Sequence, residues 1–132
     1  GALQGVQVTL LSAHGTAKAA LATPRRVIGK LMGGAVRLSE ARGELALGEG
    51  VETMLSAAAQ LGVSSWAALS ADNLGRFALP SFVERLIIVA DNDPAGVGAA
   101  ESLRLRSPAH VRVELVSAPE GFNDLNDWAR AN

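Results

Sequence analysis

Two aspartates separated by one residue, Asp91 and Asp93, follow directly after the apolar run 86–90. An uninterrupted apolar run of this kind is typical of a strand that is covered on both faces, as in the parallel sheets of α/β proteins. Ligands of such sheets bind beyond the carboxyl ends of the strands, and side chains two residues apart on an extended chain point the same way. Both carboxylates can therefore face one ligand. Because these groups offer only oxygen atoms, they favour a hard cation such as Mg²⁺.

Further acidic residues recur where the sequence turns from a predicted strand to a predicted helix. They are Glu49 in the segment 47–50, and Asp124 and Asp127 in the segment 121–128. In a parallel sheet these turns share one edge, and carboxylates that lie close together raise one another's pKa unless a cation neutralises them. The pattern predicts a metal site formed by Glu49, Asp91, Asp93, Asp124 and Asp127.

Two glycines lie next to these acids. Gly50 follows Glu49, and Gly96 comes three residues after Asp93. A residue without a Cβ atom lets backbone N–H groups approach a phosphate at the start of a helix. We therefore expect Gly50 and Gly96 to contact a nucleotide.

Some of these acids also have a purely structural interpretation. Asp93 precedes Pro94, which is the pattern of a helix N-cap followed by proline in the first turn, and Asp124 can cap the last helix in the same way. Both interpretations stay open for these two residues. Glu49 and Asp91 end apolar strands, where structure alone does not demand a carboxylate.

Composition and charge set limits on the kind of protein. The chain has 132 residues, of which 48% are apolar, and this is enough to bury a core. It contains no cysteine, which excludes disulfides, a zinc ribbon and a thiol nucleophile within it. No apolar segment is long enough to span a bilayer, and the first residues do not have the layout of a secretory signal, so we expect a cytoplasmic protein without membrane contact.

The charges are distributed unevenly along the chain. Residues 1–42 hold six cationic side chains and one acid, whereas residues 43–132 hold six cationic side chains and twelve acids. The basic segment includes Arg25, Arg26 and Lys30, which we expect to bind a polyanion near the acidic site. The alternative is that these side chains form a solvated basic face.

The hydrophobic pattern predicts the elements that position these residues. Strands are predicted at residues 45–48, 66–69, 86–90 and 111–116, with helices at residues 51–61, 94–106 and 125–130 and a short helix or loop at residues 71–79. This alternation implies a mostly parallel α/β sheet flanked by helices, in a domain of residues 44–132. Residues 1–43 are predicted to form a small, irregular, basic β region that packs on the core or extends it.

Three acidic motifs in this order resemble those of the Toprim domain, the Rossmann-like catalytic fold of bacterial-type primases, topoisomerases, nucleases and small recombination mediators. The first motif is Leu47-Gly48-Glu49-Gly50-Val51-Glu52-Thr53, and the second is Ile88-Val89-Ala90-Asp91-Asn92-Asp93-Pro94-Ala95-Gly96, which looks like the primase form. The third is Asn123-Asp124-Leu125-Asn126-Asp127-Trp128, in which Asn123 stands where primase-like members often have lysine. A looser resemblance links residues 24–38 to the segment that precedes Toprim in plasmid-type and phage-type primases and primase-helicases.

The resemblance implies a function as well as a fold. The chain would be the catalytic core of a DNA primase, a nucleotidyltransferase that makes RNA primers on single-stranded DNA from nucleoside triphosphates. Glu49, Asp91 and Asp93 would be the catalytic residues and would bind Mg²⁺ or Mn²⁺. The chain would be a piece of a longer protein that works with a helicase domain or a helicase partner.

Two other functions are compatible with the pattern, and two more lack a residue that they need. A Toprim nuclease would use the same acids to activate water, and a recombination mediator would keep the fold as a non-catalytic DNA-binding module. A topoisomerase needs a tyrosine nucleophile, and the chain contains no tyrosine. A phosphatase or receiver-like domain needs a lysine late in the chain, but no lysine follows Lys30.

Overall fold

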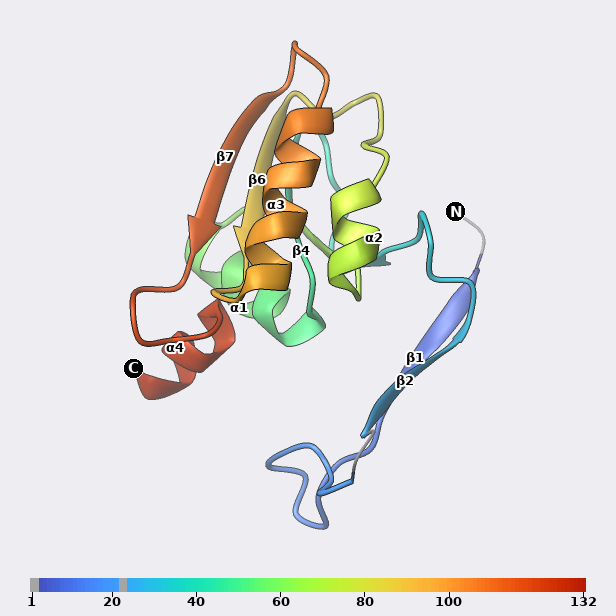
Figure 1. The fold of residues 1–132 in the computed structure, drawn as a ribbon, viewed down its shortest axis with the longest axis vertical. Helices are drawn as coiled ribbons and strands as arrows, with labels where there is room; N and C mark the ends of the chain where they lie inside the picture. Colours follow the sequence, from blue (N-terminus) through green and yellow to red (C-terminus); the bar gives the residue numbers. More distant parts are fainter. Residues whose placement is uncertain (1–2, 22–23) are drawn as a thin grey trace. The chain divides into compact units, whose positions relative to one another are not determined.

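The computed structural model describes residues 3–21 and 24–132, and the chain divides into two compact units, residues 1–32 and residues 33–132. The first unit contains the antiparallel strands β1 (Gly5–Thr9) and β2 (Arg25–Gly29), which pair from Gly5 with Gly29 to Thr9 with Arg25. The β region that the sequence predicts before the sheet is therefore present as a two-stranded pair (Figure 1).

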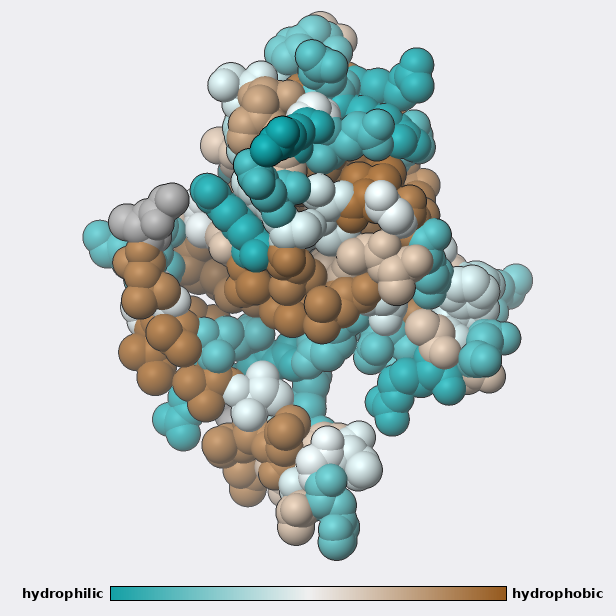
Figure 2. All heavy atoms as spheres, turned by 180° about the vertical axis from the view of Figure 1, so that it is seen from behind, coloured by the Kyte–Doolittle hydropathy of each residue, from teal (hydrophilic) through white to brown (hydrophobic). Residues whose placement is uncertain are grey.

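Apolar side chains are exposed on this strand pair and on the residues beside it. Figure 2 colours such side chains brown; in the first unit, those that are large and exposed are Leu3, Val6, Leu10, Leu11, Leu21, Val27, Ile28 and Met32. A two-stranded pair has too little area to bury its own apolar residues.

The second unit is built around a five-stranded sheet. Its strands are β3 (Val36–Arg37), β4 (Glu44–Gly48), β5 (Ser65–Ala67), β6 (Arg85–Ala90) and β7 (Arg112–Ser117), in the order β3-β5-β4-β6-β7. The helices are α1 (Val51–Leu61), α2 (Ala71–Arg76), α3 (Pro94–Arg106) and α4 (Leu125–Ala131). The strands β5, β4, β6 and β7 are parallel, and β3 is antiparallel to β5. This is the mostly parallel α/β architecture that the sequence predicts. None of the described helices is long and apolar enough to cross a membrane.

Both faces of the central strands are buried because alternate side chains enter two separate cores. Leu47 and Ile88 pack with residues of α2 and α3 on one face. Ala46 and Val89 pack with residues of α1 and α4 on the other face. Figure 1 shows α2 and α3 lying side by side over the sheet. Burial on both faces explains why β4 and β6 read as continuous apolar runs.

Residues 33–43 lie in the same compact unit as residues 44–132, since Val36 and Arg37 form β3 and pair with β5. One strand boundary differs from the expectation drawn from the sequence. The strand predicted at residues 66–69 is β5, which ends at Ala67, because Leu69 has a φ of 74° and leaves the extended conformation.

Candidate metal and catalytic site

The parallel pairing of β4 with β6 brings the first two acidic motifs to one edge of the sheet. Gly48, the last residue of β4, lies opposite Val89, so Glu49 and Asp91 follow at the same carboxyl edge. Gly48 is required by packing, since a Cβ atom there would lie 2.4 Å from the Met54 sulfur and 3.0 Å from the Val89 carbonyl oxygen. Glycine at this position therefore lets Met54 of α1 pack closely against β4. The chain then turns at Glu49 into the helix.

Asp91 is the most perturbed acid of the site. Its Oδ1 atom is buried and has no hydrogen-bond partner. Burial, followed by repulsion from Glu49, Asp124, Asp93 and Asp127, raises the pKa of Asp91 to about 7. Every neighbouring charge that shifts this pKa is an acid. The other four predicted acids thus all act on Asp91, as expected if they lie at the same end of the sheet.

Glu49 experiences the same field more weakly. Burial and the charge of Asp93 raise the pKa of the Glu49 carboxyl above its usual value. Glu49 is half-buried, and its backbone carbonyl accepts a hydrogen bond from Leu69 N at 2.8 Å, which holds the turn between β4 and α1 against the end of β5.

Asp93 and Asp124 cap helices as well as contributing charge. Asp93 Oδ1 accepts a hydrogen bond from Gly96 N at 2.7 Å at the start of α3, and Asp124 Oδ1 accepts one from Asp127 N at 2.8 Å at the start of α4. The N-cap interpretation of both residues is confirmed. A carboxylate has two oxygens, so capping with one of them leaves the other able to meet a ligand.

The two glycines near the site differ in what surrounds them. A Cβ atom on Gly96 would lie 2.6 Å from the Asp91 carbonyl oxygen and 2.9 Å from the Asp91 Cβ, so α3 can approach Asp91 only with glycine at this position. The Gly96 N–H is already donated to Asp93, and packing against Asp91 accounts for this glycine without a nucleotide. Gly50 is the N-cap of α1, which has no side-chain cap bond.

The acids converge without forming a complete ligand shell. Within residues 3–21 and 24–132, no three acidic, histidine or cysteine side chains are grouped closely enough to hold a metal ion. The buried, unpartnered Asp91 oxygen and the mutual repulsion of the acids nevertheless fit a divalent cation. Mg²⁺ usually keeps several waters and takes only one or two carboxylates together with substrate phosphates, so a full protein cage is not required.

Residues 44–132, which contain all five acids, match the Toprim domain family. The chain belongs to this family. The resemblance drawn from the three acidic motifs is thereby confirmed. A search among curated protein sequences gives no match.

Solved primase structures share the fold of this Toprim protein. The primase fragment of the bacteriophage T7 primase-helicase protein superposes with a TM-score of 0.65 at 15% identity, covering 96% of this chain and 57% of that one. A DNA primase domain from Pseudomonas aeruginosa gives 0.61 at 21% identity, covering 98% and 47%. The DnaG primase catalytic domain bound to ssDNA gives 0.58 at 17% identity, covering 98% and 48%. The chain thus spans about half the length of these structures.

The basic residues predicted to bind a polyanion lie outside the Toprim sheet. Arg25 and Arg26 begin β2, and Lys30 follows its end. Successive residues of a strand point to opposite faces, so Arg25 and Arg26 do not form one patch. Arg25 donates a hydrogen bond from Nε to Thr9 Oγ1 at 2.9 Å, whereas Arg26 is exposed. Their role in binding nucleic acid stays a prediction.

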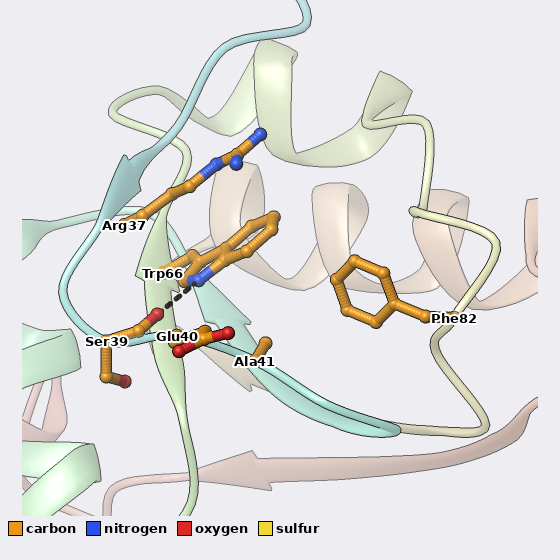
Figure 3. Close-up of a pocket in the computed structure, with 6 residues that line it drawn as sticks. All are labelled: Arg37, Ser39, Glu40, Ala41, Trp66 and Phe82. Carbon is orange, nitrogen blue, oxygen red and sulfur yellow. Dashed lines mark hydrogen bonds between the residues drawn. The ribbon is translucent and has the colours of Figure 1, made fainter. Parts of the chain in front are cut away.

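The Toprim unit also contains a hollow of about 580 Å³ (Figure 3). It is lined by Arg37, Ser39, Glu40, Ala41, Trp66 and Phe82. Ala41 precedes β4 and Phe82 precedes β6, so the hollow lies toward the amino ends of the strands, opposite the acidic edge. The Trp66 ring is covered by the Arg37 guanidinium at 4.6 Å and donates its N–H to the Ser39 carbonyl at 2.9 Å. These contacts fasten β3 and the chain after it to β5.

Two asparagines contribute to the Toprim unit in ways that the sequence analysis missed. Asn73 is fully buried, accepts a hydrogen bond from Gly33 N and donates to the carbonyl oxygens of Gly34 and Ala68. Asn92, between the two aspartates of the second motif, bonds to the segment that leads to the third motif. No sequence signal could have found the bonds of Asn92, because they depend on where segment 118–123 lies in space.

Proposed function

We propose that this chain is the catalytic core of a DNA primase, which joins nucleotides into RNA primers on single-stranded DNA. The observation that carries the proposal is the Asp91 carboxyl, whose buried oxygen has no partner and whose charged neighbours are all acids. A divalent cation would give this oxygen a partner and offset the repulsion among the acids. Membership in the Toprim family and the primase folds of its structural neighbours support this choice of chemistry.

Each acid has a separate part in the proposed site. Glu49, Asp91 and Asp93 would hold the cation, and Asp124 and Asp127 would add negative charge around it. A bound Mg²⁺ or Mn²⁺ would supply positive charge for the triphosphate and the reacting oxygens. Glu49 is half-buried and its pKa is raised, so its carboxylate is suited to accept a proton from the attacking hydroxyl.

Binding of the triphosphate and the template would use groups other than these acids. Helix α1 begins after Gly50, and the positive end of its dipole would attract a phosphate. Arg25, Arg26 and Lys30 would hold the template or the triphosphate through their charges. The remainder of the longer protein, including a helicase domain or partner, would complete the enzyme.

Primer synthesis by a Glu49→Gln variant of the full-length protein tests the proposal. The amide is nearly isosteric with the carboxylate but is neutral and a poor base, so we expect nucleotide incorporation on a single-stranded template to fall at least about 100-fold, a typical effect of losing general base catalysis. DNA affinity and the free energy of unfolding should remain close to those of the parent.

The same assay separates the alternatives that share these acids. Metal-dependent cleavage of DNA without primer synthesis would identify a Toprim nuclease instead. DNA binding by a parent protein that shows neither activity would identify a non-catalytic DNA-binding or recombination module. Synthesis that is unchanged by Glu49→Gln would overturn the assigned role of this residue.

A further inference from the structure

The side chain and backbone of Asn92 bind three carbonyl groups of one segment. Asn92 Nδ2 donates hydrogen bonds to the carbonyl oxygens of Ala118 at 2.9 Å and Phe122 at 2.7 Å. The Asn92 backbone N–H donates to the carbonyl oxygen of Asn123 at 2.6 Å. Residues 118–123 connect β7 to α4, so these bonds join the turn after β6 directly to the approach to α4.

This connection lies between the second and third acidic motifs. Asn92 is flanked in sequence by Asp91 and Asp93, and the last residue that it binds, Asn123, is adjacent to Asp124. The Asn92 amide bonds to the 118–123 segment, in the turn that follows β6 and carries Asp91 and Asp93. The bond from Asn92 N to the Asn123 carbonyl therefore joins the second motif to the third directly.

The chemistry of the contact is specific to an amide. The Asn92 side chain bonds to two carbonyl acceptors, and its NH₂ group supplies one donor to each of them. An aspartate of the same size would place carboxylate oxygens against the carbonyl oxygens of Ala118 and Phe122. The contact would then be repulsive.

The other contacts of α4 hold its first turn to α1. Leu125 is buried in the core with residues of α1, and Asn126 Oδ1 accepts a long hydrogen bond of 3.4 Å from Ser56 Oγ in α1. These contacts do not bridge to the turn that carries Asp91 and Asp93.

We propose that Asn92 is a positioning residue, which sets the distance between the Asp91/Asp93 turn and the acids Asp124 and Asp127 by holding segment 118–123. This inference rests on the proposed function, because it assumes that these acids serve one cation. Replacing a residue that holds metal ligands in position typically lowers the metal affinity about 10-fold to 100-fold.

The affinity for Mn²⁺ of the intact chain, measured by electron paramagnetic resonance, tests the inference with Asn92→Ala and Asn92→Asp. If charge alone mattered, the additional carboxylate of Asn92→Asp would strengthen Mn²⁺ binding. If Asn92 positions the acids, both variants should bind Mn²⁺ about 10-fold more weakly, and Asn92→Asp should do so despite its extra negative charge.

Ser102→Ala provides the control for a general loss of stability. Ser102 Oγ donates to the carbonyl oxygen of Gly75 at 3.3 Å and joins α3 to α2, away from the acids. We expect this variant to keep Mn²⁺ affinity within about twofold of the parent. Hydrogen exchange provides a readout without metal, in which the amides of residues 118–128 should exchange faster in both Asn92 variants and at the parental rate in Ser102→Ala.

The outcomes distinguish this inference from the proposed function. If Mn²⁺ binds the parent and Asp91→Asn equally, the proposed metal site is wrong. If binding depends on Asp91 but is unchanged in both Asn92 variants, or is tighter in Asn92→Asp, only the positioning role is overturned. Weaker binding in Ser102→Ala equal to that in Asn92→Ala would also overturn it.

Discussion

The Asp91 carboxyl makes the stability of the metal-free protein depend on pH. Its pKa is about 7 in the folded protein and near 3.8 in the unfolded chain, so folding favours its protonated form. Its contribution to stability is therefore fully present below about pH 4 and is lost as the pH rises to 7. Glu49 adds a change of the same sign, because its pKa is also raised.

We predict that Asp91→Asn stabilises the metal-free protein, and more so at high pH. One unit of pKa shift corresponds to about 1.4 kcal/mol, and solvent screens part of the repulsion at this incompletely buried site, so a gain on the order of 1–2 kcal/mol is expected at pH 8. The gain should shrink toward pH 4. Urea unfolding in the presence of a chelator at pH 4, 6 and 8 measures it.

Saturating Mn²⁺ provides the control for this prediction. A cation that binds only the folded parent raises its free energy of unfolding by mass action, so the advantage of Asp91→Asn at pH 8 should fall or reverse. A variant that is equally stable with the parent at all three pH values in chelator would contradict the description of Asp91 as a repelled, buried acid.

Gly96 and Gly98 offer a matched pair of substitutions in one helix. A Cβ atom on Gly96 would overlap the backbone of Asp91, whereas one on Gly98 would meet nothing within 4 Å. Gly96→Ala should destabilise the protein by about 1–3 kcal/mol, as overpacking does, and should weaken Mn²⁺ binding because Asp91 is displaced. Gly98→Ala should stabilise it by about 0.5–1 kcal/mol through helix propensity. Thermal unfolding of both variants checks the opposite signs.

At the scale of the element, the caps of α3 and α4 combine folding with the proposed chemistry. Asparagine caps a helix about as well as aspartate but carries no charge. We predict that Asp93→Asn keeps the free energy of unfolding within about 0.5 kcal/mol of the parent while weakening Mn²⁺ binding, whereas Asp93→Ala also loses the cap, at a cost of about 1 kcal/mol. Calorimetric titration with Mn²⁺ and urea unfolding separate the two effects. Equal Mn²⁺ affinity in Asp93→Asn and the parent would reduce Asp93 to a cap.

Local signals explain which elements could be predicted from the sequence. The predicted bounds of α1 and α3 agree with the structure, because Gly62 ends α1 in a left-handed conformation and Pro94 begins α3 after its cap. The pairing of Val36 with Ala67 is different, since β3 lies far from β5 in sequence and nothing near Val36 announces its partner. The position of β3 in the sheet could therefore be determined only from the structure.

The same distinction applies to the site. The acids could be predicted to meet, because parallel strands bring the residues after them to one edge. The three bonds of Asn92 depend on where segment 118–123 lies in space, and the packing of Gly96 on Asp91 depends on the approach of α3. Neither follows from residue type or spacing alone.

At the scale of the whole molecule, the unequal charge of the chain predicts salt-dependent binding of single-stranded DNA. Each contacted phosphate releases counterions, so the logarithm of affinity should fall linearly with the logarithm of salt concentration. Arg26 is exposed on β2, and Arg26→Glu should reduce the slope by about 1. Arg76→Glu, on α2 beside Asp72, is the matched reversal outside the basic segment. Fluorescence anisotropy at several salt concentrations measures both, and equal slopes in the parent and Arg26→Glu would show a merely solvated side chain.

The strand order leaves one edge of β6 unpaired for a time while the chain is synthesised on the ribosome. One edge of β6 can pair with β4 at once, but the other edge must wait for β7, which ends 27 residues later. At 5–20 residues per second, that edge stays open for roughly 1 to 5 s. It presents Ile87, Ile88 and Val89, which are apolar and β-branched and therefore prone to pair with another chain. The strand that leads to Asp91 is thus also a segment that can aggregate with other chains until β7 has been made.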